Sequence, residues 1–151
     1  MIAKSKSAHN NQSEVRVDSN LLFVGDNPWL HNRTKGELSS AKPLDEGGLV
    51  GVLTEQNVIF IVPQGKGVTK SFFEGYFSNF ARNALSEDYT LNLSERISVT
   101  FTSVEGENND RLQQTASNMR YALNSIETSW RDEMVKAAAM SSSKIAKNKH
   151  K

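Results

Sequence analysis

The residues with the clearest chemical potential stand in one loop, Gly65-Lys66-Gly67-Val68-Thr69-Lys70-Ser71, between a β-branched run and an aromatic-rich segment. Glycines, lysines and hydroxyls between a strand and a helix are the ingredients of a phosphate site. A nucleotide-binding loop of the G-x-x-x-x-G-K-[ST] type needs glycine at positions 64 and 69, where Gln64 and Thr69 stand. The sequence therefore argues against a nucleoside triphosphatase. Weaker anion binding through Lys66 and Lys70 at the helix start stays open, as does an ordinary capped turn.

The hydroxyls of this loop allow a second interpretation, a regulatory switch. The run Ser71-Phe72-Phe73-Glu74-x-x-Phe77 resembles the S-F-x-E-x-x-F core of STAS-like domains, small α/β modules distantly similar to anti-sigma-factor antagonists. The later "LNLSERISVTFTS" looks like the strand that follows in that family, so the resemblance spans residues 58–103. It implies a protein–protein regulatory module with Ser71 or Thr69 as phospho-acceptor. The chain departs from the family at 48–62, where a hairpin is predicted instead of a helix.

Acid–base and metal chemistry have few candidate residues. The chain has no cysteine, and of its three histidines only His31 stands outside the terminal segments. One histidine near one aspartate makes neither a metal site nor a catalytic triad. The carboxylate pairs, such as Asp45-Glu46 and Glu87-Asp88, have the pattern of solvated charge. We predict no catalytic residue, no metal and no cofactor, and hence a non-enzymatic protein.

The formal charge of +1 conceals an uneven distribution. Residues 14–135 contain 11 bases and all 17 acids, a net charge of −6, whereas both terminal segments contain lysines and no acid. An acidic body is a poor surface for a nucleic-acid backbone. Nucleic acid is therefore a candidate partner only through the lysines of the C-terminal segment, which also suit a solubilising tail. They are Lys144, Lys147, Lys149 and Lys151.

The chain shows no targeting or membrane signal. Residues 1–6 carry charge without an apolar stretch, and no run approaches the roughly 18 apolar residues of a membrane span. We predict a cytoplasmic protein without a membrane partner. It would have a flexible basic tail over residues 1–13, one domain over 14–137 and a basic tail over 138–151.

Hydrophobic patterning predicts the fold of that domain. Strands are expected at 14–18, 21–24 and 97–102, and the runs 48–53 and 57–62 predict a hairpin covered on both faces. Residues 29–46 read as a long surface loop, which is often functional. Apolar residues from 72 to 85 recur at helical spacing behind Ser71, which with Glu74 predicts a capping box. The predicted fold class is α+β: one small domain with a mixed or mainly antiparallel sheet of four or five strands and two main helices, the C-terminal one long.

The last helix shows the most regular pattern. Its apolar positions step by three or four residues over about seven turns, close to a heptad seam. A helix of about 28 residues is about 42 Å long, twice the roughly 20 Å of a small sheet. We therefore expect it to overrun its domain and meet another protein or a second copy, as in a regulatory or assembly protein. The predicted interface residues are Leu123, Ile126, Trp130 and Met134.

Two other functions remain open at this stage. One is a nucleic-acid accessory protein that binds through the lysine-rich tails. The other is a small enzyme or anion-binding domain built on the 65–71 loop together with the 25–46 loop. The aromatic residues from 72 to 80 stand at helix-core spacing with Glu74 among them, so they predict a core and not a platform for stacked bases.

Overall fold

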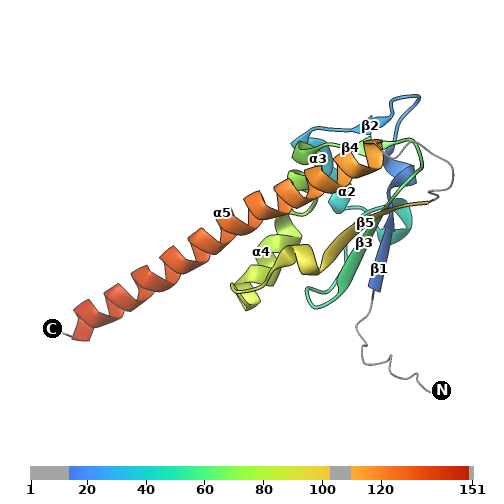
Figure 1. Cartoon of the computed structure of the whole chain (residues 1–151). Helices are drawn as coiled ribbons and strands as arrows, with labels where there is room; N and C mark the ends of the chain where they lie inside the picture. The colour runs from blue at the N-terminus through green and yellow to red at the C-terminus, as the bar shows by residue number, and fades with distance from the viewer. Residues whose placement is uncertain (1–13, 103–109, 150–151) are drawn as a thin grey trace, which may run out of the picture.

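The computed structural model describes residues 14–102 and 110–149 (Figure 1). The predicted tail at 1–13 lies outside the described residues. The described elements, in chain order, are β1 (Glu14–Asp18), β2 (Trp29–Leu30), α2 (Arg33–Ser40), β3 (Asn57–Val62), β4 (Gly67–Val68), α3 (Lys70–Tyr76), α4 (Ser78–Glu87), β5 (Ile97–Phe101) and α5 (Asp110–Lys149). Short 3-10 helices stand at Ser19–Leu22 (η1), Leu44–Glu46 (η2) and Leu93–Glu95 (η3).

The predicted sheet is wrong in both size and direction. The described strands form a three-stranded sheet in the order β1-β3-β5 and a two-stranded sheet β2-β4, and every pairing is parallel. Parallel neighbours need a crossover between them, and the chain supplies α2 before β3 and α3 with α4 before β5. The described part of the chain therefore has four α-helices, where two main ones were predicted.

The predicted hairpin is absent because residues 48–53 form turns and not a strand. The amide of Leu49 donates to Ser40 O, and the amide of Val52 donates to Leu49 O. Gly51 adopts φ +85°, a left-handed conformation that a strand does not use. The β-branched composition of this run predicted a strand, but its backbone hydrogen bonds hold it against the end of α2. Similarly, the strand predicted at 21–24 is replaced by η1 and the turn after it.

Among the described residues, helices cover one face of the main sheet. In β3, Val58, Phe60 and Val62 are buried, whereas Ile59 and Ile61 on the opposite face are half-buried. The expectation that both faces are covered is therefore wrong. The topology gives the reason: the strands follow one another in order across the sheet, so crossovers of the same hand place their helices on the same side. β5 lies at a sheet edge, as predicted.

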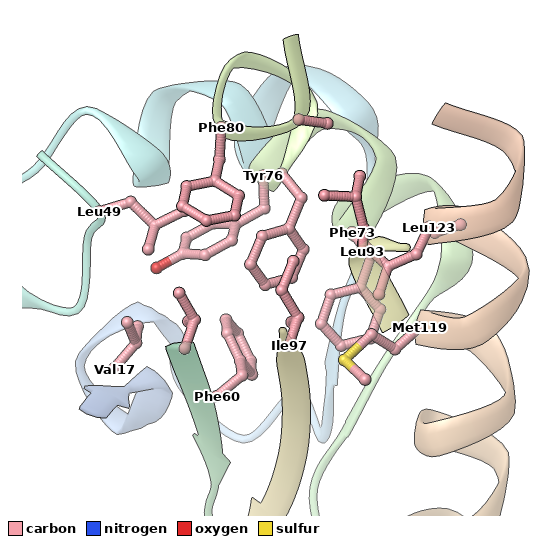
Figure 2. Packing of buried hydrophobic residues seen from close by; sticks show 14 of the residues in the cluster. Val17, Leu49, Phe60, Phe73, Tyr76, Phe80, Leu93, Ile97, Met119 and Leu123 are labelled. Carbon is pink, nitrogen blue, oxygen red and sulfur yellow. The ribbon is translucent and has the colours of Figure 1, made fainter. Parts of the chain in front are cut away.

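The core is built by the aromatic segment against the central strand (Figure 2). Phe60 meets Phe73 and Tyr76 edge-on, with ring centroids 5.2 and 5.1 Å apart. Phe77 stacks on Phe73 at 6.0 Å. Such pairs add about 0.5–1.5 kcal/mol each beyond their burial. The prediction that these aromatics form core is confirmed.

The segment 70–87 is two helices and not one. α3 ends at Tyr76, and α4 starts at Ser78 after Phe77. The cap of α3 is Thr69, whose hydroxyl accepts from the Phe72 amide at 3.3 Å, so the predicted capping box at Ser71 and Glu74 is wrong. The spacing of apolar residues passes through the break without interruption, which is why the sequence predicted one helix.

Helices α2 and α3 touch through two glycines. A Cβ on Gly75 would lie 2.0 Å from Arg33 O, and one on Gly36 would lie 2.1 Å from Phe72 O. Gly75 was expected to bring its helix close to the sheet, but it brings it close to α2. Helix α2 stands in the predicted 29–46 loop. Its polar sequence RTKGELSS carries little apolar periodicity, because glycine and serine (Gly36 and Ser39) are its buried residues.

The long C-terminal helix is confirmed, and it is longer than predicted. α5 has 40 residues and continues through most of the segment assigned to the basic tail. At 1.5 Å per residue it is about 60 Å long. Figure 1 shows its first half packed on the body and its second half projecting past every other element.

Candidate functional site: the 65–71 loop and the two halves of α5

The 65–71 loop is held by hydrogen bonds to its backbone on several sides. The amide of Gly67 donates to Pro28 O at 2.8 Å, and that of Thr69 donates to Leu30 O at 2.9 Å. The amide of Val68 donates to the buried Thr115 hydroxyl at 3.1 Å. These three donors already have acceptors within the protein. The loop is therefore built as a clamp between β2 and α5, and these amides are not aimed at a ligand.

The start of α5 completes this clamp. Asn118 Nδ2 donates to Val68 O at 2.9 Å, and the Arg111 guanidinium donates to Gly65 O. The same guanidinium lies over the ring of Trp29, 5.5 Å from its centroid. Sequence analysis did not single out these α5 side chains. The sequence could have pointed to Thr115, because it is a polar residue beside one of the regularly spaced apolar positions of the last helix.

The four loop residues proposed for anion binding or phosphorylation do not converge. Lys66 Nζ lies over the Phe23 ring, 5.5 Å from its centroid. Lys70 Nζ pairs with the Glu74 carboxylate at 2.9 Å. The Thr69 hydroxyl caps α3, and Ser71 is exposed in the first turn of that helix. Modification at Ser71 or Thr69 stays a prediction, and no cradle of two lysines forms here.

The 65–71 and 25–46 loops do meet, as the enzyme hypothesis requires. They share an open depression of about 430 Å³. Its lining carries amides, an imidazole and a hydroxyl but no carboxylate, and its residues are Asn27, Trp29, His31, Thr69, Gln114 and Asn118. The one imidazole lies 3.5 Å from the Asn27 amide nitrogen. Within residues 14–102 and 110–149, no cluster of His, Asp or Glu could hold a metal ion.

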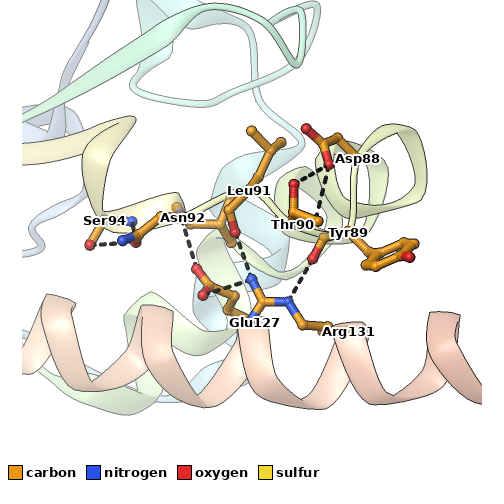
Figure 3. A network of polar contacts seen from close by, with 9 residues as sticks. Asp88, Tyr89, Thr90, Leu91, Asn92, Ser94, Glu127 and Arg131 are labelled. Atoms are coloured by element: carbon orange, nitrogen blue, oxygen red, sulfur yellow. Dashed lines mark hydrogen bonds and ion pairs between the residues drawn. The ribbon is translucent and has the colours of Figure 1, made fainter.

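The first half of α5 is anchored by a polar clamp as well as by the core (Figure 3). Glu127 accepts from the Leu93 amide at 2.7 Å and pairs with Arg131 at 3.0 Å. Arg131 in turn donates to Tyr89 O and Leu91 O, each at 2.6 Å. Because one arginine satisfies two loop carbonyls and a carboxylate, it fixes α5 to the 88–95 loop. Arg131 is the last residue of α5 for which a bond to the body is described.

The predicted interface residues lie mostly within the fold. Leu123 and Ile126 are buried by the chain's own core. Trp130 is half-buried against that core and has the Arg82 guanidinium 5.6 Å from its ring centroid. Met134 is half-buried at the boundary. Whether they bind a partner stays a prediction.

Beyond Met134 the helix exposes apolar side chains to solvent. Residues 135–140 are all exposed, with Val135 at 47% and Met140 at 67% of full accessibility. We call residues 135–149 of α5 the rod. Its sequence contains Lys136, Lys144, Lys147 and Lys149 and no acidic residue. The rod therefore combines exposed apolar side chains with a basic sequence.

The phenol of Tyr76 is fully buried. Burial raises the pKa of its phenol, so the group stays protonated and donates to Gly47 O at 2.9 Å. This bond ties α3 to the turn after η2. Its role is structural, because its partner is a backbone carbonyl.

A scan of family models, a search of curated proteins and a search of solved structures each found no match to this chain. None of the helices in the described residues combines the length and the hydropathy needed to cross a bilayer.

Proposed function

We propose that this chain is a non-enzymatic cytoplasmic assembly or regulatory protein that acts through protein–protein contacts of the rod. One observation carries the proposal: α5 continues as a helix to Lys149, far past the bonds that Arg131 makes to the body, with Val135 and Met140 exposed. The packed half of α5 supplies the helix nucleus, so the rod extends an existing helix, and its side chains Val135 and Met140 are exposed. A rod of this kind gains stability when a partner covers its apolar side chains.

The resemblance to STAS-like domains supports the same class of function, and it remains a hypothesis. The hairpin by which the chain was expected to depart from that family is absent, and α2 precedes β3 instead. That finding removes a difference from the family pattern without testing membership. Ser71 is exposed in the first turn of α3, which suits a modifiable hydroxyl.

Nucleic-acid binding through the rod is the second candidate, and its lysines favour it. A phosphate backbone attracts a basic helix, and such binding weakens steeply with salt. The helix macrodipole is a structural explanation for lysines in the last turn, such as Lys147 and Lys149. It does not explain Lys136, which stands several turns earlier.

A photo-crosslinking residue placed at Met140, in cells that make the protein, tests the proposal. We expect discrete protein adducts, because Met140 is exposed on the rod. The matched control carries the same residue at Ser98, which is exposed on the uncovered face of the sheet. Equal adducts from both positions, or none from Met140, would contradict a protein-binding rod.

A further inference from the structure

The body carries a surface pocket next to the segment that replaces the predicted hairpin. Its volume is about 270 Å³, and it lies between α2, residues 49–54 and α4. Its apolar lining includes Leu49, Val50 and Phe80. Val50 is 51% exposed, and Leu53, beside the pocket, is 57% exposed. These side chains leave apolar surface in water that a protein partner could cover.

One acidic side chain lines this pocket, and a second bonds to a residue of its lining. Glu37 is part of its lining, and Glu87 accepts from Thr54, a lining residue, at 3.2 Å. Glu55 follows Thr54 in the chain. Basic groups are also close: Arg33 pairs with Glu37 at 3.6 Å, and Arg96 donates to the carbonyl of Thr54. The two segments that form the pocket, 37–55 and 79–88, still contain six acids and two bases, namely Glu37, Asp45, Glu46, Glu55, Glu87 and Asp88 against Lys42 and Arg82.

The rod and the pocket complement each other in charge and in polarity. The rod has four lysines, no acid and exposed apolar side chains at Val135 and Met140. Lysine stems can lie along apolar surface while their ammonium groups reach acidic neighbours. Opposite charges attract the rod to the pocket region. Two rods repel each other, because both are positively charged.

We propose that the rod of one chain docks in the pocket of a second copy of this chain. The inference rests on the proposed function, since it names the partner of the rod. A rod cannot reach the pocket of its own chain, because α5 is continuous and projects away from the body (Figure 1). Rod and pocket are different surfaces, so two copies that exchange rods close into a dimer, and copies that do not exchange form open chains.

The partner is a second copy and not nucleic acid because the rod carries more than charge. Phosphates require basic side chains alone, and exposed Val135 and Met140 gain nothing from them. A pocket with an apolar lining, between two segments of net negative charge, uses both features. A contact between one helix end and a pocket of about 270 Å³ is small for a protein interface. Small interfaces are usually transient, so we expect association that depends on concentration.

Sedimentation of the full chain over a range of concentrations tests the inference. We expect a mass of two or more chains at high concentration in about 0.05 M salt, and at least about a tenfold weaker association in about 0.5 M salt, because screening shortens the reach of the charges. The rod variant Lys136→Glu/Lys144→Glu and the pocket variant Glu37→Lys/Glu87→Lys should each weaken association at least about tenfold. A mixture of the two variants should recover it.

The matched control is Glu14→Lys/Asp26→Lys, which makes the same charge change at exposed residues outside the pocket. It should leave association unchanged within about twofold. The inference is overturned if wild type has the mass of one chain throughout, if the control weakens association as much as the pocket variant does, or if the mixture fails to recover association. Salt-sensitive binding of wild type to duplex DNA by a chain that stays monomeric would overturn it in favour of nucleic acid.

The two proposals fail in different ways. If the Met140 probe crosslinks a different protein and the chain sediments as a monomer, the rod binds protein but the second copy is not its partner. If the Met140 probe gives no adduct at all, the proposed function itself fails. An adduct with the mass of two chains supports both.

Discussion

From Asp110 to Arg131 the helix α5 packs on the body, whereas from Val135 to Lys149 it projects beyond it. The packed half buries Met119, Leu123 and Ile126 and makes polar bonds to two loops. The projecting half exposes Val135 and Met140. Both halves are helical, so helix formation alone does not show which half packs on the body and which half stays exposed. Tertiary packing separates a half that stabilises the fold from a half that is available to a partner.

A proline in each half should give the strongest contrast. Asn124→Pro alters an exposed position of the packed half, where proline removes a helix hydrogen bond and clashes with the preceding turn. It should lower the free energy of unfolding by about 3 kcal/mol or more. Ser142→Pro should change the stability of the body by less than about 0.5 kcal/mol. Urea unfolding followed by fluorescence reports the body, because Trp29 and Trp130 both lie there. Equal losses from the two variants would contradict the division of α5.

Truncation of one apolar side chain in each half should give the next largest contrast. Leu123→Ala removes a fully buried side chain and should cost about 2–5 kcal/mol, since it leaves a cavity. Met140→Ala removes an exposed one and should cost the monomer less than about 0.5 kcal/mol. Thermal unfolding at low protein concentration, where association is absent, provides the measurement. A cost above about 1 kcal/mol for Met140→Ala would mean that the rod packs on its own body.

The polar clamp at the boundary should have an intermediate effect. Arg131→Ala removes the donor to the carbonyls of Tyr89 and Leu91 and to one oxygen of the Glu127 carboxylate. We expect a loss of about 1–2 kcal/mol, because the site is partly exposed and water replaces some of the bonds. Faster amide hydrogen exchange in residues 88–95 should accompany it. Arg120→Ala, an exposed arginine of the same helix, is the control and should change neither quantity.

The smallest expected effect on stability comes from Asp88, in the 88–95 loop that Arg131 holds. The Thr90 hydroxyl and amide donate to Asp88 and lower the pKa of its carboxyl below the ordinary 3.8. A lowered folded-state pKa means stabilisation that is present above about pH 4 and is lost as pH falls through the folded value. Asp88→Asn should therefore lower the stability slightly near pH 7, where the carboxylate is charged, and flatten the acid side of the stability curve, so that variant and wild type converge at low pH. A steeper acid limb in the variant would reverse the assigned sign.

The sequence correctly predicted the elements whose apolar residues recur on one face. Val15 and Val17 alternate with charged neighbours, and β1 forms there. The aromatic residues from 72 to 80 recur at helical spacing, and they are buried in the core. The prediction failed where composition and backbone conformation disagree. Residues 48–53 are rich in valine and leucine but turn at Gly51, and α2 is polar because its buried residues are Gly36 and Ser39.

The candidate site was predicted in part. That α5 overruns the body was predicted from its length, since a helix has a fixed rise. Most of the exposed helix was not predicted, because residues 138–151 were assigned to a basic tail. The residues available on it did not follow, because Leu123 and Ile126 continue the same spacing as Met134 and yet are buried by the chain itself. The pocket was not predicted. It lies between α2, residues 49–54 and α4, and contacts between residues far apart in the chain, such as the Thr54 hydroxyl bond to Glu87, bring its lining together.

The amino-acid sequence by itself determined that the chain forms a long terminal helix and a body of opposite charge, because spacing and composition are local properties. It also determined that one aromatic segment fills the core. Only the tertiary structure decided that the strands run parallel, since strand direction depends on where each crossover returns. It also decided where α5 leaves the body, because that boundary is set by contacts between residues such as Arg131 and Leu91 that are far apart in the chain.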